Sequence, residues 1–138
     1  MAASKPHRWD RIGWLLAATG AAALGNGLWA LVASEHGYAS LASDTGPFDV
    51  HFVRDIGEAY AMVGVALLWA ARTPRWRAPL TSVATVFLGL HALGHVYEIA
   101  TGALDLHQRL EELPGVLLAA PVAAGMSVRS LRLARQGS

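Results

Sequence analysis

The feature that most constrains this chain is a long run of apolar residues near its start. Residues 12–33 are twenty-two amino acids without a charge, and about 20 apolar residues in a helix cross a bilayer. Because a cleaved signal peptide has a shorter apolar core, we interpret the run as a retained membrane span. Three further apolar runs follow, so we predict an all-α fold, a single membrane domain over 1–138. Its four transmembrane helices would form an antiparallel up-down bundle with spans at about 12–33, 48–71, 80–100 and 113–130.

The composition narrows the chemistry that the chain can perform. Hydrophobic residues make up 54% of the chain and charged residues only 15%, which is more apolar than a typical soluble domain. The chain has no cysteine, so disulfides, thiolate metal sites, iron–sulfur clusters and thiol catalysis are excluded. A metal site would have to use imidazole and carboxylate ligands. The net charge of +1 argues against nucleic acid as a partner, and the expected partner is the lipid bilayer.

The positions of the basic residues predict the orientation of the spans. Most Lys and Arg residues lie in the N-terminal arm, in the connection after the second span or in the C-terminal tail, whereas the first and third connections are acidic. Cytoplasmic loops are enriched in Lys and Arg. We therefore expect both termini in the cytoplasm and the acidic connections outside it. The basic residues in question are Lys5, Arg8, Arg11, Arg72, Arg75, Arg77, Arg129, Arg132 and Arg135.

Two segments depart from a regular span. Residues 34–47 are rich in turn-forming residues, and we expect a loop there. The fourth run is short, with Pro114 at a helix-start position and Pro121 near its middle. Because proline removes a backbone hydrogen bond inside a helix, we expect a kink at Pro121.

The predicted second and third spans each carry three ionisable residues at positions i, i+4 and i+7. At roughly 100° per residue these spacings place all three side chains on one helix face. The first motif reads H-x-x-x-D-x-x-E and the second reads H-x-x-x-H-x-x-E. Their residues are His51, Asp55 and Glu58 in the first motif and His91, His95 and Glu98 in the second.

The two motifs lie at matching depths if the second and third spans form an antiparallel hairpin. A short turn joins these spans, which favours antiparallel neighbours. Each residue of one motif then faces a residue of the other motif. The result is three pairs at three depths in the membrane, and each pair has one imidazole and one carboxylate. Ionisable groups at such depth normally face the bundle interior, and the site would open to the extracytoplasmic side. The predicted pairs are His51 with Glu98, Asp55 with His95, and Glu58 with His91.

The leading hypothesis is a metal centre. Imidazole and carboxylate ligands without cysteine suit Fe, Mn, Zn or Cu(II), and related ligands hold metals inside four-helix bundles. One or two ions would perform redox or hydrolytic chemistry on a lipophilic molecule, which makes a membrane oxidoreductase one possible activity. In this hypothesis Glu58, Asp55 and His95 are the catalytic residues, and Asn26 and Arg54 support the bound group. The expected metal ligands are His51, Asp55, Glu58, His91, His95 and Glu98.

Three alternatives to this metal centre use the same residues. Carboxylate–imidazole pairs in a low-dielectric site can move a proton on and off an apolar substrate, as in an isomerase, or along a pathway in a proton-coupled carrier. One four-helix unit is small for a carrier, which favours an acid–base site or a homo-oligomer. Haem with two axial imidazoles is a weaker alternative, because three carboxylates are poor neighbours for a porphyrin. The last alternative is a purely structural ladder of interhelical hydrogen bonds.

The chain resembles a group of small bacterial membrane proteins. Its length, its four predicted spans and the stretch Arg54-Asp55-Ile56-Gly57 followed by Gly64 are similar to DoxX-like proteins or to uncharacterised four-helix membrane families. The resemblance to DoxX-like proteins implies quinone-linked redox chemistry, and therefore a quinone or another lipophilic molecule as ligand. It assigns no catalytic residue. The high Ala, Gly and Arg content suggests a GC-rich bacterial genome, so we expect a multi-pass protein of the bacterial inner membrane.

Overall fold

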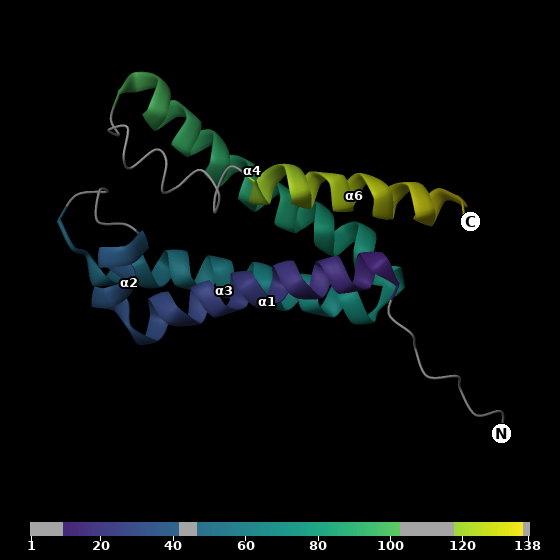
Figure 1. Ribbon diagram of the computed structural model, residues 1–138, viewed down its shortest axis with the longest axis horizontal. Helices are drawn as coiled ribbons and strands as arrows, with labels where there is room; N and C mark the ends of the chain where they lie inside the picture. Colours follow the sequence, from purple (N-terminus) through teal and green to yellow (C-terminus); the bar gives the residue numbers. More distant parts are fainter. Residues whose placement is uncertain (1–9, 42–46, 103–117, 137–138) are drawn as a thin grey trace.

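The chain is almost entirely helical in the part that its computed structural model describes, which comprises residues 10–41, 47–102 and 118–136 (Figure 1). No strand is present in these three segments, which confirms the predicted all-α class. A 3₁₀ turn, Pro74–Trp76, connects α3 to α4. The helices are α1 (Arg11–Val32), α2 (Ser34–Leu41), α3 (Val50–Arg72), α4 (Arg77–Thr101) and α6 (Ala119–Gln136).

Helices α1 and α3 form the most closely packed pair. Gly27 of α1 lies so near α3 that a Cβ atom on it would stand 2.5 Å from the backbone oxygen of Gly57 and from the backbone nitrogen of Ala61. Gly20 and Gly64 make the next contact along the same two helices, seven residues away on each. Small residues at this spacing let two helix backbones approach closely. Glycine therefore fixes which face of α3 is turned toward α1.

Helices α4 and α6 form a second pair that lies across the first (Figure 1). A hydrogen bond between the Ser82 and Ser127 hydroxyls, 3.1 Å long, joins α4 to α6. A shared apolar core, which includes Leu16, Leu67 and Leu88, connects the two pairs. Figure 1 shows that α3 and α4 diverge away from their connecting turn, toward the ends that carry the two sequence motifs.

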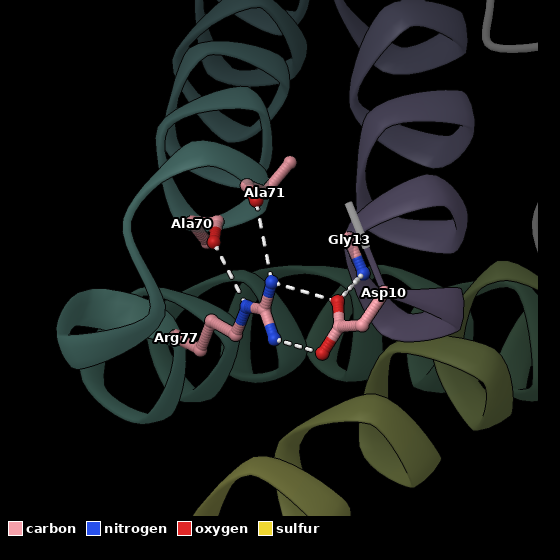
Figure 2. A network of polar contacts seen from close by, with 5 residues as sticks. All are labelled: Asp10, Gly13, Ala70, Ala71 and Arg77. Atoms are coloured by element: carbon pink, nitrogen blue, oxygen red, sulfur yellow. Dashed lines mark hydrogen bonds and ion pairs between the residues drawn. The ribbon is translucent and has the colours of Figure 1, made fainter. Parts of the chain in front are cut away.

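A buried arginine at the start of α4 connects the end of α3 to the start of α1 (Figure 2). The Arg77 guanidinium donates from Nε to the carbonyl of Ala70 at 3.2 Å and from Nη2 to the carbonyl of Ala71 at 3.3 Å. It also pairs in a two-pronged manner with Asp10, at 2.7 and 2.9 Å. Asp10 in turn caps α1, because its carboxylate accepts a hydrogen bond from the Gly13 backbone N–H at 2.8 Å.

This network changes the role expected for Arg77. From the sequence, Arg77 was one of nine basic residues that orient the spans, but its side chain is only 8% exposed. Its donors satisfy carbonyls at the end of α3 that have no partner within the helix. The hydrogen bond and charge of Arg77 hold the pKa of the Asp10 carboxyl below its ordinary value. Arg77 is therefore a structural residue of the fold.

Each predicted span overlaps one of the long described helices α1, α3, α4 and α6, but not at every boundary. The segment 34–47 was expected to be a loop, yet Ser34–Leu41 forms helix α2. The described helix α6 begins at Ala119, so Pro121 lies in its first turn, where a missing backbone N–H breaks no helical hydrogen bond. The kink predicted at Pro121 stays a prediction, because residues 103–117, which precede this segment, lie outside the described ones. Lys5, Arg8 and Pro114 lie outside the described residues.

Two of the described helices are long and apolar enough to cross a membrane. They are α1 and the segment Pro74–Thr101, which contains α4. Helix α3 has a similar length, but Arg54, Asp55 and Glu58 make its first half less apolar.

Candidate functional site

The second sequence motif forms a continuous polar contact along α4. The Nε2 atoms of His91 and His95 lie 3.3 Å apart, which is within hydrogen-bond distance. On the other side of the ring, His95 Nδ1 lies 3.5 Å from a carboxylate oxygen of Glu98. The helical spacing of four and then three residues brings these side chains onto one face, as the sequence predicted. One carboxylate and two imidazoles are thereby joined in series.

Aromatic rings enclose the inner end of this series. The His91 ring stacks on Phe87, with centroids 6.0 Å apart and planes 8° from parallel. Tyr60 of α3 meets His91 edge-on at 5.7 Å and meets Phe87 edge-on at 5.6 Å. The contact between α3 and α4 at this depth is therefore made by Tyr60, and His91 lies in a mainly apolar setting.

The three polar side chains differ in their access to the surroundings. The Glu98 side chain is 46% exposed, whereas the His95 side chain is only 17% exposed. His91 is half-buried between its aromatic neighbours. The series therefore leads from an accessible carboxylate near the end of α4 to an imidazole inside the fold. We call Glu98, His95 and His91 the α4 relay.

The geometry of the α4 relay restricts the tautomers of its two histidines. If His95 donates from Nδ1 to the Glu98 carboxylate, its neutral ring has a lone pair at Nε2. His91 must then donate its Nε2–H to that lone pair. This arrangement leaves Nδ1 of His91 as the remaining proton-accepting nitrogen. A series of this kind can pass a proton from ring to ring and to the carboxylate.

The first sequence motif has a different environment. His51, Asp55 and Glu58 are all exposed on α3. The physical reason is the glycine packing described above, since Gly57 must face α1 and Glu58 lies about 100° further around the helix. His51 and Asp55 share the face of Glu58 and are likewise turned away from the core.

The structure does not bring the two motifs together in the predicted three-level arrangement. His91, which was expected to face Glu58, faces Tyr60. Within residues 10–41, 47–102 and 118–136, no group of three or more His, Asp or Glu side chains is arranged to hold a metal ion. Asn26 is half-buried on α1, next to the glycine that contacts α3, and Arg54 is exposed. Their supporting role remains a prediction, as do the metal and catalytic roles of the six motif residues.

One protein-family model matches most of this chain. Residues 12–105 match the model described as "Domain of unknown function (DUF4345)", which is more than half of the chain. The chain belongs to the DUF4345 family. This fits the expectation of an uncharacterised family, whereas the resemblance to DoxX-like proteins is not shown. No curated protein and no solved structure matches the chain.

Several important residues of this DUF4345 protein did not stand out in its sequence. Phe87 lies four residues before His91, so the same helical spacing that pairs His91 with His95 also predicts that Phe87 lies beside His91. The sequence indicates only a core or interface role for Tyr60, and the packing of α3 is needed to show that it faces His91. The pairing of Asp10 with Arg77 joins residues 67 positions apart and has no local signal.

Proposed function

We propose that this DUF4345 protein is an integral protein of the bacterial inner membrane, with four spans and both termini in the cytoplasm. In support, large apolar side chains are exposed on each of the four long helices, and a soluble protein rarely exposes so many of them. The start of α1, the turn after α3 and the end of α6 lie at one end of the molecule (Figure 1). Arginines gather at that end, as expected for a cytoplasmic side. Examples of the exposed apolar residues are Trp14, Val32, Met62, Leu90, Leu93 and Leu133.

We further propose that the α4 relay is an acid–base site that exchanges a proton with a lipophilic molecule. The observation that carries the proposal is the unbroken series of contacts, 3.5 Å from Glu98 to His95 and 3.3 Å from His95 to His91. Chains of carboxylates and histidines of this kind serve as proton relays in membrane proteins. The apolar walls around His91 suit a molecule that partitions into the bilayer.

The proton transfer balances along the relay. A proton accepted at Nδ1 of His91 makes that ring cationic, and the ring then releases its Nε2 proton to Nε2 of His95. His95 releases its Nδ1 proton to the Glu98 carboxylate. One proton enters at His91, one proton arrives at Glu98, and both histidines end as neutral rings. The reverse sequence delivers a proton from Glu98 to the bound molecule.

A binding titration of metal-free protein in detergent tests this function. The resemblance to DoxX-like proteins makes decylubiquinol a suitable probe, and tryptophan fluorescence would report its binding. We expect the affinity to change with pH between about 5 and 8, where histidine titrates. At the pH where the wild type binds decylubiquinol most tightly, His95→Ala should weaken binding about tenfold, which corresponds to one lost hydrogen bond to a charged group.

Glu35→Gln is the matched control for a Glu98→Gln variant, because Glu35 is an exposed carboxylate on α2. We expect Glu98→Gln to shift the pH dependence, because His95 loses its charged partner, and Glu35→Gln to leave it unchanged. Thermal unfolding of each variant separates a lost site from a lost fold. Binding that is independent of pH, or equal in wild type and His95→Ala, would contradict the proposal.

A transition-metal site is the second candidate, and the distance between the two histidines favours it. Two nitrogens bound to one tetrahedral Zn²⁺ at about 2.0–2.1 Å lie about 3.3 Å apart, and the Nε2 atoms of His91 and His95 are separated by 3.3 Å. Metal analysis of protein purified without a His-tag tests this candidate. A near-stoichiometric metal content that is lost in His95→Ala would support it, and a trace content that is unchanged by the substitution would exclude it.

A further inference from the structure

Helix α3 carries an exposed stripe whose spacing is that of a coiled-coil seam. The intervals between its residues alternate between four and three, which is the pattern of the a and d positions of a heptad repeat. All members are exposed, including Met62 at 60% and Val65 at 54%. We call this stripe the α3 seam. Its residues are His51, Asp55, Glu58, Met62, Val65 and Trp69.

The polar half of the α3 seam needs a partner in a membrane. Within the described residues, the side chains of Asp55 and Glu58 form no hydrogen bond or ion pair. Glu58 lies eight residues into α3, which is about 12 Å along the helix axis. Ionised groups facing lipid are costly, and those within spans normally face protein or water. The exposed surface of α3 is therefore incomplete in a single chain.

We infer that a second copy of this chain covers the α3 seam and forms a homodimer. Two copies inserted with the same topology present their α3 helices in parallel, so that equal positions meet at equal depth, as in a parallel coiled coil. Arg54 flanks the seam next to Asp55 and is exposed. In a two-fold pair the Arg54 of each copy lies beside Asp55 of the other, so that the two guanidiniums can neutralise part of the negative charge that equal seam positions bring together.

The charged and apolar halves of the seam have separate roles in this dimer. Met62, Val65 and Trp69 provide the apolar contact, and polar residues at a few seam positions fix the register of a coiled coil. The carboxylates leave the lipid and lie beside Arg54 of the other copy. This inference rests on the membrane location proposed above and is independent of proton transfer by the α4 relay.

Disulfide cross-linking in native membranes tests the dimer directly. The chain has no cysteine, so each single-cysteine variant reports one position only. We expect an oxidant to link Met62→Cys to itself and Val65→Cys to itself, because equal seam positions come within disulfide range. Leu28→Cys on α1 and Val83→Cys on α4 are the controls, since both residues are exposed but lie on other helices. These two variants should remain monomeric.

A charge reversal supplies the second measurement. Arg54→Glu should weaken cross-linking through Val65→Cys about tenfold, because the arginine that neutralises the carboxylates of the other copy would be replaced by a further carboxylate. Arg75→Glu makes the same charge change at an exposed residue of the turn and should have no effect. Membrane-embedded protein without a cross-link at either seam position would overturn the dimer. A cross-link to a different protein would overturn it as well, whereas protein that is not in the membrane would overturn the proposed location.

Discussion

Arg77 satisfies several polar groups at once, which makes it the residue whose loss should affect the fold most. Its guanidinium contacts the carbonyls of Ala70 and Ala71 and both oxygens of the Asp10 carboxylate. A buried carbonyl without a donor costs free energy, and the planar guanidinium has donors in several directions. Lysine has one charged centre and cannot reproduce this geometry.

The Arg77→Lys variant should therefore be less stable. We expect the free energy of unfolding to fall by about 1–3 kcal/mol, since at least one buried carbonyl loses its donor. Thermal or denaturant unfolding in detergent provides the measurement. Arg75→Lys is the control, because Arg75 is exposed in the same turn, and its effect should stay within about 0.5 kcal/mol. Equal stability of the two variants would contradict the structural role of Arg77.

The pH dependence of stability should report the Asp10–Arg77 pair. The pKa of Asp10 is lowered in the folded protein from its ordinary value of 3.8. The stabilisation is therefore fully present above that value and is lost as the pH falls through the lowered folded pKa. Because the Asp10 side chain is 53% exposed, solvent screening makes this contribution modest.

The measurement compares wild type with Asp10→Ser, which keeps a helix-capping oxygen but removes the charge. The stability difference between them should be present at neutral pH and should shrink below pH 3.8. A difference that is constant from neutral to acidic pH would show that the charge of Asp10 has no such role.

The packing of α1 against α3 depends on glycines that cannot carry a side chain. A Cβ on Gly27 would lie 2.5 Å from backbone atoms of Gly57 and Ala61, and one on Gly64 would collide with Leu24. Gly25, two residues before Gly27, has no atom within 4 Å of its Cβ position. The same substitution should thus have opposite effects at Gly25 and Gly27.

Gly27→Ala should destabilise the protein by about 1–3 kcal/mol, because the helices must move apart or distort. Gly25→Ala should be neutral or should stabilise by up to about 1 kcal/mol, because alanine favours the helix. Unfolding measurements on both variants check this pair. Similar destabilisation by both substitutions would contradict the close approach of α1 and α3.

The helices themselves could be predicted from the sequence because apolar runs and charged connections are local signals. The α4 relay could also be predicted, since His91, His95 and Glu98 belong to one helix and their spacing alone brings them together. The packing of α3 relative to α4 could not be predicted in this way. The helical spacing says which residues share a face but not which neighbour that face meets.

The glycines of α1 and α3 decided that question. Gly27 and Gly64 require α1 and α3 to pack face to face, which turns Asp55 and Glu58 away from α4. The assumption that the short turn makes α3 and α4 close partners over their full length was wrong, because α4 packs mainly against α6. Helix α2 was missed because its glycine and serine residues are more typical of turns than of helix interiors.

On the scale of the molecule, the four long described helices form two pairs, with a polar network toward each end. Arg77 and Asp10 fix the end that carries most of the arginines, and the α4 relay with Tyr60 lies toward the other end. This separation lets the first end hold the fold while the second end remains accessible through Glu98. In the proposed topology, this end is the extracytoplasmic one.

The location should be visible in fractionation and reporter experiments. Protein extracted with alkaline carbonate should remain in the membrane fraction, because the exposed faces of its long helices are apolar. Reporters fused to each terminus should be active only in the cytoplasm, as the arginine distribution requires. Release by carbonate, or reporters on opposite sides, would contradict the four-span topology.

Nitrogen-15 NMR of the histidine side chains tests the α4 relay most directly. With neutral histidines, the wild-type protein should show a hydrogen-bond coupling between Nε2 of His91 and Nε2 of His95, which lie 3.3 Å apart. The coupling should disappear in His95→Ala, and Glu98→Gln should change the His95 Nδ1 resonance because the carboxylate acceptor is lost. Two imidazoles without coupling, or with both Nε2 atoms unprotonated and bound to a metal, would contradict the relay.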